Sequence, residues 1–313
     1  MRVKVLGSAA GGGFPQWNCG CSNCSRLRQG VFKGNARTQA QVALSPADSV
    51  WFLINASPDL RQQLTGLPEF APKPETRSTP VSSILLTSAD VDCVMGLLHL
   101  REFQPLHIYS TLSVKRILTE ENSLFRALER SNPPVRWETL TLDRLLPIYQ
   151  QPPPGARMSL FCKAVPLSGN FPDYVSDSLR MALPEEEAVI GLQFVQNEKR
   201  FFYAPSLSGR GEDWKRRTTE SHLALLDGTF WTDDELIKAQ AKQGGGKTAR
   251  QMGHMPLSGV NGLVEQLKLV RNVRKVLTHL NNTNPVLDED SPARAAVVAA
   301  GFEVAQDGME FEL

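Results

Sequence analysis

The sequence has little cysteine, no long hydrophobic run and no excess of charge of either sign. Five cysteines among 313 residues are too few, and odd in number, for the disulfide framework of a small secreted domain. No segment approaches the ~20 consecutive apolar residues that span a bilayer, which excludes an integral membrane transporter. A formal net charge of +1 gives no electrostatic reason to expect nucleic acid or an anionic membrane as a partner. The expected partner is therefore a small molecule.

The composition is that of an ordinary globular protein. Hydrophobic residues make up 41% and charged residues 21% of the chain, which is enough for a large core. Sandwich folds of ~200 to 250 residues or more form single units, so we expect one domain over residues 1–313. The first residues lack the apolar segment of a signal peptide, so we expect a cytoplasmic protein. The sequence leaves the oligomeric state open, including a homodimer.

Strand-like and helical segments alternate in both halves of the chain. The segments with strand patterns are residues 3–6, 41–44, 49–54, 82–87, 106–109, 187–195, 200–203, 223–226 and 275–278. Helices are expected from residue 94, after Ser110-Thr111, over 262–270 and from the start signal Ser291-Pro292. Strands mixed with helices in both halves predict an α/β fold in which two sheets pack face to face with helices outside.

Three of the five cysteines lie on one short segment, as Cys19, Cys21 and Cys24. Three thiolates on a tight loop can converge on a tetrahedral zinc ion, with a fourth ligand from elsewhere in the chain. The alternative is three buried cysteines without a metal, but such clustering is rare by chance in a chain with few cysteines. Because a closed set of ligands is typical of structural sites, we predict a structural zinc here.

A second set of candidate ligands follows the predicted strands. Asp90, Asp92 and Cys93 come after one strand, and Asp227 and His279 end two others. Carboxylate, imidazole and thiolate groups that meet at sheet ends can hold Zn²⁺ or Fe²⁺. The spacing alone also fits a simpler interpretation, in which the two aspartates after the first strand only cap the following helix.

Two loop segments also carry residues with chemical potential. His254 lies before a predicted helix, where it can transfer protons, bind a metal or be a solvated surface histidine. The segment Gly244-Gly245-Gly246-Lys247-Thr248 is similar to a phosphate-binding loop, but that pattern requires glycine where this sequence has Ala241. We therefore predict a flexible loop over 244–248 and no nucleotide hydrolysis.

Several distinctive motifs occur together along the chain. They are Gly7-Ser8-Ala9-Ala10-Gly11-Gly12-Gly13-Phe14-Pro15-Gln16-Trp17-Asn18-Cys19, Ala36-Arg37-Thr38-Gln39, Asn55-Ala56-Ser57-Pro58-Asp59, Asp227-Gly228-Thr229, Met252-Gly253-His254 and His279-Leu280-Asn281-Asn282-Thr283-Asn284-Pro285. This combination resembles the family of pyrroloquinoline quinone (PQQ) biosynthesis protein B, PqqB, and the resemblance extends from Met1 to Asp307-Gly308-Met309. It implies the metallo-β-lactamase fold, an αββα four-layer sandwich shared with phosphodiesterases and tRNA-processing nucleases.

The resemblance implies that the metal site of the hydrolases is not retained. Those relatives carry His-x-His-x-Asp-His where this chain has Ser88 to Cys93, so only Asp92 is kept. Cys93 stands where PqqB proteins usually keep a histidine. The hydrolases also have a histidine at the position of Ser168 and a bridging aspartate within the segment 203–205. A dinuclear hydrolytic zinc site is therefore not expected.

The resemblance instead implies hydroxylation of the tyrosine ring of a crosslinked Glu-Tyr precursor, with one non-haem iron and dioxygen. Asp92, His279 and Cys93 would hold the iron, His254 would transfer protons and Asp227 would orient a ligand. A non-catalytic carrier that assists transport of PQQ or its precursor is the second hypothesis, and a metal-dependent hydrolase is the third. Other proteins of PQQ biosynthesis are the expected partners.

For the cysteine segment, the resemblance implies a fourth ligand from the residues after the strand-end histidine. That region contains Asn282, and asparagine is a poor zinc ligand. His279 is the alternative fourth ligand, in which case it is lost to the second site. The sequence leaves both assignments open.

Overall fold

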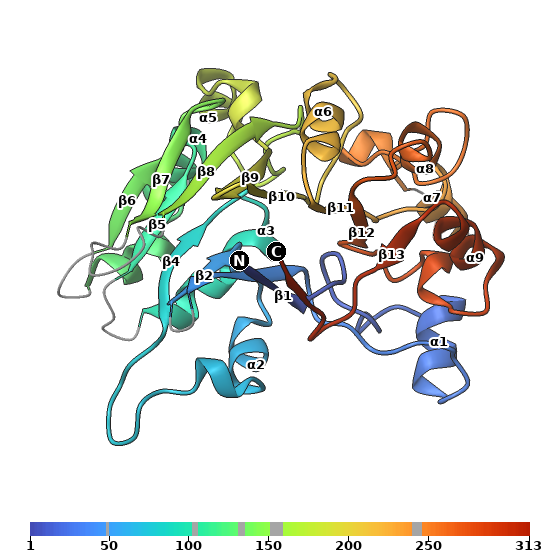
Figure 1. The fold of residues 1–313 in the computed structure, drawn as a ribbon, viewed down its shortest axis with the longest axis horizontal. Coiled ribbons are helices and arrows are strands. Elements are labelled where there is room, and N and C mark those ends of the chain that lie inside the picture. Colours follow the sequence, from blue (N-terminus) through green and yellow to red (C-terminus); the bar gives the residue numbers. More distant parts are fainter. Residues whose placement is uncertain (48–49, 102–105, 131–134, 151–158, 240–245) are drawn as a thin grey trace.

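Two β-sheets form the centre of the structure, a computed structural model that describes residues 1–47, 50–101, 106–130, 135–150, 159–239 and 246–313 (Figure 1). Within these residues each sheet has seven strands, in the orders β14-β1-β2-β3-β4-β5-β6 and β13-β12-β11-β10-β9-β8-β7. The strands of the first sheet are β1 (Arg2–Gly7), β2 (Gln41–Ala47), β3 (Val50–Ile54), β4 (Val81–Leu85), β5 (His107–Ser110), β6 (Arg136–Thr139) and β14 (Glu310–Glu312). Those of the second are β7 (Leu145–Gln150), β8 (Ser159–Pro166), β9 (Ile190–Gln196), β10 (Lys199–Ala204), β11 (Leu223–Asp227), β12 (Arg274–Thr278) and β13 (Phe302–Val304).

Both faces of the central strands are buried, which explains their nearly continuous hydrophobic runs. In β3, Phe52 and Ile54 belong to the core between the two sheets, together with Phe194 of the second sheet. The alternate residues Trp51 and Leu53 belong to the core that includes the helices. Successive side chains of a strand point to opposite faces, so each sheet is covered by the other sheet on one side and by helices on the other. The predicted four-layer arrangement is confirmed.

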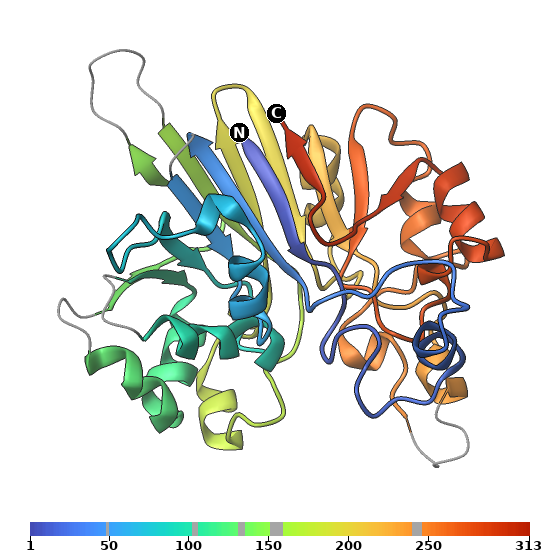
Figure 2. The same ribbon diagram turned by 90° about the horizontal axis from the view of Figure 1, so that it is seen from below.

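The helices lie outside the sheets (Figure 2). They are α1 (Ser22–Arg28), α2 (Leu60–Thr65), α3 (Val91–Val94), α4 (Leu112–Arg116), α5 (Asp177–Ala182), α6 (Asp213–Thr219), α7 (Glu235–Ala239), α8 (Leu263–Leu267) and α9 (Pro292–Ala299). The predicted start signals are confirmed, because the side chains of Thr111 and Ser291 accept capping hydrogen bonds at α4 and α9. The helix expected over 262–270 covers only Leu263–Leu267. In the described part of the chain, no helix has the length and apolar character needed to cross a membrane.

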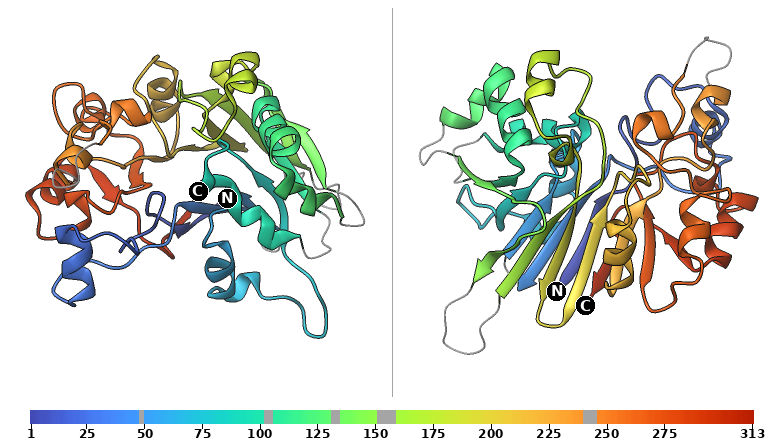
Figure 3. Two further views of the ribbon diagram at one scale, coloured as in Figure 1. Left: turned by 180° about the vertical axis from the view of Figure 1, so that it is seen from behind. Right: turned by 90° about the horizontal axis from the view of Figure 1, so that it is seen from above.

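Segments from the two ends of the chain lie side by side (Figure 3). Strand β14 pairs with β1, and the N-terminal ammonium group donates a hydrogen bond of 3.0 Å to the carbonyl of Leu313. Helix α1 lies near α9, and Arg26 of α1 forms an ion pair of 2.5 Å with Asp288. The N-terminal segment that carries the three cysteines is therefore packed against the C-terminal part of the chain.

The candidate site residues lie where parallel strands of both sheets end. Strands β3 to β6 run parallel in the first sheet, and β10 to β13 run parallel in the second. A bridge between Ser88 and Val189 joins the two sheets beyond the end of β4, and another joins Ala9 to Leu280 beyond the ends of β1 and β12. The carboxyl ends of parallel strands are where α/β proteins place ligands, so this shared edge is the expected position of a site.

Candidate functional site

The three clustered cysteines converge in space. Their sulfur atoms all lie within 4.8 Å of one another. The side-chain amide nitrogen of Asn282 lies 3.0 Å from Cys19 Sγ, 3.6 Å from Cys21 Sγ and 3.4 Å from Cys24 Sγ. The structure thus places Asn282 at the cysteines, whereas His279 contacts other residues described below. We call this group of four residues the cysteine site.

The cysteine site has the dimensions of a tetrahedral zinc site. With zinc–sulfur and zinc–oxygen distances of ~2.3 and ~2.1 Å, two ligand atoms of a tetrahedron lie about 3.6 Å apart. The amide nitrogen of Asn282 is near this separation from Cys21 Sγ and Cys24 Sγ, at 3.6 and 3.4 Å, and is closer to Cys19 Sγ, at 3.0 Å. A half-turn of the amide group exchanges its nitrogen for its oxygen, which can face a cation. Among the described residues, the donor set therefore fits a zinc ion with three sulfur ligands and one amide ligand.

The local structure prepares Cys19 to ionise. Burial alone would raise the pKa of this thiol, but hydrogen bonds from Cys21, Cys24 and Asn282 outweigh burial and lower its pKa. Burial raises the pKa of Cys21 to about 12. Asn23 ties the segment to the opposite loop, because its side chain donates to the carbonyls of Asn282 and Asn284 at 3.1 and 3.0 Å. The cysteine site therefore joins the first and last parts of the chain.

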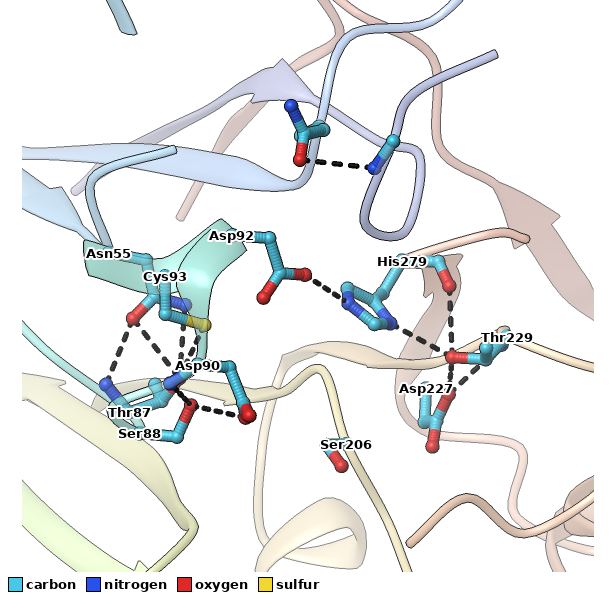
Figure 4. Close-up of polar contacts among 12 residues, drawn as sticks. Asn55, Thr87, Ser88, Asp90, Asp92, Cys93, Ser206, Asp227, Thr229 and His279 are labelled. Atoms are coloured by element: carbon cyan, nitrogen blue, oxygen red, sulfur yellow. Dashed lines mark hydrogen bonds and ion pairs between the residues drawn. The ribbon is translucent and has the colours of Figure 1, made fainter. Parts of the chain in front are cut away.

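Asp92 and His279 meet at the shared edge of the two sheets (Figure 4). Asp92 Oδ2 lies 3.0 Å from His279 Nε2. The hydrogen bond and charge of Asp92 raise the pKa of His279 against the opposing effect of burial, and His279 in turn lowers the pKa of Asp92. Each side chain thus favours the charged form of the other.

The other ring nitrogen of His279 is held by a hydrogen-bonded chain. Thr229 Oγ1 lies 2.9 Å from His279 Nδ1 and 2.6 Å from Asp227 Oδ1. The hydroxyl of Thr229 contacts two acceptors, Asp227 Oδ1 at 2.6 Å and the carbonyl oxygen of His279 at 3.0 Å. With its proton directed to either of them, the Thr229 oxygen accepts the proton on His279 Nδ1. In the neutral ring, this arrangement directs the lone pair of Nε2 toward Asp92. Such a hydroxyl and carboxylate behind a histidine are typical of metal ligands.

The sheet register explains how these residues reach one another. Asp227 pairs with Thr278 across β11 and β12, so His279 follows directly beside Asp227. Close approach of the two strand ends requires glycine at position 228, where a Cβ atom would lie 2.9 Å from the carbonyl oxygen of Thr278. His279 itself has a positive φ of 58°, a conformation uncommon for a residue other than glycine. The turn at His279 therefore depends on its surrounding contacts.

His254 joins the same group from a loop. Its Nδ1 atom lies 2.8 Å from Asp227 Oδ2 and 3.1 Å from Thr229 Oγ1, and its ring stacks on that of His279 with centroids 5.4 Å apart. Asp227 is fully buried, yet the charges of the two histidines lower its pKa below the ordinary value. Because Nδ1 is engaged by Asp227, Nε2 is the nitrogen of His254 that can act on a substrate.

Two groups of three or more acidic, histidine or cysteine side chains have mutually close ligand atoms within the described chain. One is the cysteine triplet, and the other is Asp227, His254 and His279. In the second group the hydroxyl of Thr229 lies among the donor atoms, at 2.6 to 3.1 Å from them. The centre of that group is therefore filled by a protein atom, and the face of His279 open to a metal is Nε2, toward Asp92.

Asp90 and Cys93 line the same cleft as this pair but make separate contacts. Asp90 occupies the N-cap position of α3, but its side chain makes no capping hydrogen bond there and accepts instead from Ser88 Oγ at 2.8 Å. Burial and the charge of Asp92 raise the pKa of Asp90 to about 6. Cys93 Sγ contacts Thr87 Oγ1 at 3.9 Å, and burial raises the pKa of the thiol well above its usual value. Neither residue belongs to the close groups described above.

Asp92, His254 and His279 line a cleft with a volume of about 840 Å³. Its lining includes Asp90, Asp92, His254 and His279, together with Tyr174, whose hydroxyl donates to the carbonyl of Ala89. This size suits a small-molecule ligand. The charged groups could be predicted from their positions at strand ends. Thr229 was not predicted as the link between the histidines, although it stands in the motif Asp227-Gly228-Thr229, and no sequence pattern indicates Tyr174.

Comparisons with known proteins agree with this architecture. The family described as Beta-lactamase superfamily domain matches residues 50–280. "Coenzyme PQQ synthesis protein B" of Azotobacter vinelandii is 40% identical and that of Azoarcus sp. is 42% identical, each over 100% of both chains. A crystal structure of Zn²⁺-bound PqqB from Methylobacterium extorquens superposes with a TM-score of 0.88 at 38% identity, also over 100% of both chains. The fold is therefore the metallo-β-lactamase sandwich, and the chain belongs to the coenzyme PQQ synthesis protein B family.

Proposed function

We propose that this protein acts in PQQ biosynthesis as an iron-dependent hydroxylase of the tyrosine ring of a crosslinked Glu-Tyr precursor. The observation that carries the proposal is the contact between Asp92 and His279 at 3.0 Å on the wall of the cleft. The names of its relatives assign them to synthesis of coenzyme PQQ. A small-molecule cleft in a chain of this family supports the same pathway for this protein.

The donor atoms of Asp92 and His279 suit one metal ion. Two ligands at ~2.1 Å from a metal and at right angles to each other lie about 3 Å apart, which is the separation observed here. A carboxylate and an imidazole are ligands of non-haem iron sites that keep open positions. A ferrous ion held there would supply the redox chemistry that lets dioxygen react with a phenol ring.

The residues behind the ligands set their protonation. Thr229 and Asp227 keep a proton on His279 Nδ1, so that Nε2 is free of a proton when it binds metal. His254 Nε2 is placed to accept or return a proton of the substrate phenol. Hydroxylation inserts one oxygen atom of dioxygen into a ring C–H bond. The other oxygen leaves as water, with two electrons and two protons from an added reductant of the ascorbate or dithiol class.

Zinc is proposed for the cysteine site in a structural role. The site is closed by Asn282 and lies in a segment that links α1 to the loop after β12. A closed tetrahedral site stabilises a fold and does not present an open position to substrate. In this assignment His279 remains with Asp92, and the two metals have separate tasks.

The experiment is oxygen uptake by protein loaded with zinc and ferrous iron, given the Glu-Tyr precursor and ascorbate. We expect oxygen consumption together with a product that is heavier by one oxygen atom for each hydroxylation. The variant Asp92→Asn should lose both signals and keep its zinc. Product formation at the wild-type rate by Asp92→Asn, or none by wild-type protein, would contradict the proposal.

The carrier hypothesis is the second candidate, and Cys93 favours it. Cys93 Sγ is buried against Thr87 Oγ1 at 3.9 Å, and burial raises the pKa of the thiol, which disfavours the thiolate form that binds metal. Among the described residues, this leaves Asp92 and His279 as the contacting ligands of the second site, which fits weak metal binding. A protein that binds PQQ tightly and takes up zinc but no iron would support the carrier.

A further inference from the structure

An ion pair joins two loops on the lining of the cleft. Lys247 Nζ lies 3.2 Å from Asp173 Oδ2, and both residues line the cleft. Lys247 precedes the 3-10 helix η6 (Arg250–Met252), whereas Asp173 lies between β8 and α5. Among the residues that line the cleft in the described part of the chain, Lys247 is the only lysine or arginine.

The loop of Lys247 is held by hydrogen bonds and leads directly to His254. The amide of Thr248 donates to Gln251 Oε1 at 2.8 Å, and the amide of Arg250 donates to Asp233 Oδ1 at 3.0 Å. Gly253 then ends η6 in a left-handed conformation, directly before His254. A short segment with defined hydrogen bonds thus connects Lys247 to His254. Residues 244 and 245 of the glycine-rich motif lie outside the described residues.

The loop of Asp173 is fixed to the segment before Asp90. The neighbouring Tyr174 donates its hydroxyl to the carbonyl of Ala89, which precedes Asp90. The amide of Val175 donates to the carbonyl of Pro172 at 3.1 Å and closes the turn around Asp173. The ion pair therefore connects the segment that carries His254 with a loop that contacts the segment before Asp90.

Lys247 can readily leave Asp173 for another anionic partner. The side chains of Lys247 and Asp173 are 60% and 85% exposed, and ion pairs at such exposure contribute little net stability. The histidines on the cleft are already engaged, His254 with Asp227 and His279 with Asp92. Lys247 is consequently the protein cation on this cleft that can most readily turn to an anionic ligand.

We propose that Lys247 binds a carboxylate of the ligand, in exchange for Asp173, and so orients a carboxylate-bearing aromatic compound in the cleft. The proposal rests on the proposed function, because it concerns the substrate class of the same cleft. A lysine ammonium is a compact charge on a flexible stem, which suits a carboxylate that arrives from solvent. Lys247, the described lysine of the motif that is similar to a phosphate-binding loop, thus acquires a role in carboxylate recognition.

The test uses PQQ, a planar tricarboxylate, and its trimethyl ester as probes of the zinc-loaded full chain. Titration calorimetry gives the Kd of each probe for wild-type protein, Lys247→Met, Lys247→Arg and Asp173→Asn. Lys268→Met is the matched control, because Lys268 is an exposed lysine paired with Glu265 and does not line the cleft.

Lys247→Met should weaken PQQ binding about ten-fold, which corresponds to about 1.4 kcal/mol. Lys247→Arg and Lys268→Met should stay near the wild-type value, and Asp173→Asn should bind PQQ more tightly because Lys247 loses its competitor. The trimethyl ester should bind wild-type protein and Lys247→Met equally. Equal affinity of wild-type protein and Lys247→Met for PQQ, or no binding of PQQ by wild-type protein, would overturn the assignment of Lys247.

The two proposals fail separately. Binding of PQQ that depends on Lys247 in a protein without oxygen uptake would keep the carboxylate site and reject the hydroxylase. Oxygen uptake with product formation, together with a Kd for PQQ that is unchanged in Lys247→Met, would keep the hydroxylase and reject the carboxylate site.

Discussion

His279 Nε2 and Asp92 Oδ2 lie 3.0 Å apart, although 187 residues separate them in the chain. Asp92 follows β4 of one sheet, and His279 follows β12 of the other. Their contact therefore joins the two sheets at the edge where parallel strands of both end. A metal bound by both side chains would lie on this seam, with the cleft on its open side.

Thr229 is expected to control the affinity of that metal. Thr229→Val removes the hydroxyl that links His279 Nδ1 to Asp227 and leaves the side-chain shape nearly unchanged. Loss of such an outer partner of a metal ligand weakens binding by about 10- to 100-fold. Titration of zinc-loaded protein with ferrous iron measures the change. Thr229→Ser keeps the hydroxyl and should bind like wild-type protein, and an unchanged affinity in Thr229→Val would show that the link has no such role.

Asn282 is expected to be the fourth ligand of zinc. Asn282→Asp replaces a weak amide ligand by a carboxylate and should slow removal of zinc by a chromogenic chelator, whereas Asn282→Ala should speed it. Cys24→Ser should lose most of the zinc. Cys162→Ala is the matched control, because Cys162 is buried in β8 and is not one of the three clustered cysteines. Identical zinc release from all Asn282 variants would place the fourth ligand elsewhere.

Much of the fold, and the positions of several site residues at the ends of strands, could be predicted from the sequence. The hairpin of β2 and β3, the caps at Thr111 and Ser291, and the strands that end at Asp227 and before His279 follow from local patterns. The contact of Asp92 with His279 and the position of Asn282 depend on how two sheets and two distant loops pack. Local spacing carries no information on such contacts. The motif resemblance supplied the fold and pathway, and the side-chain partners required the structure.

Glu235 is expected to make stability depend on pH. This buried carboxyl accepts hydrogen bonds from the amide of Trp231 and from Thr283 Oγ1, at 2.6 and 2.5 Å. Burial raises its pKa from 4.5 to about 7. Between these two pH values the folded state therefore keeps a proton on Glu235 that the unfolded chain has lost. The stability that this proton contributes is full below pH 4.5 and is lost as the pH rises toward 7.

The comparison with Glu235→Gln isolates this effect. The variant keeps the shape and does not titrate, so wild-type protein should lose free energy of unfolding relative to the variant between pH 4.5 and 7. Urea unfolding at several pH values measures the difference. A difference between the two proteins that does not vary with pH would show that Glu235 has an ordinary pKa.

Cys93→His is expected to strengthen the second metal site. An imidazole there would add a neutral nitrogen ligand near Asp92, in place of a thiol whose pKa is raised by burial. The larger ring must fit a buried position, so the variant should also be less stable, by about 1–3 kcal/mol. Iron affinity and urea unfolding give the two quantities. Cys93→Ser controls for loss of the sulfur, and weaker iron binding in Cys93→His than in wild-type protein would exclude this position from the site.

The most direct test of the account is the number of metal ions bound. Protein with zinc in the cysteine site is titrated anaerobically with ferrous iron, and bound metal is measured by elemental analysis. Wild-type protein should bind one equivalent of iron in addition to zinc, and Asp92→Asn and His279→Gln should keep the zinc and bind no iron. One equivalent of iron in both variants, or none in wild-type protein, would contradict a metal site formed by Asp92 and His279.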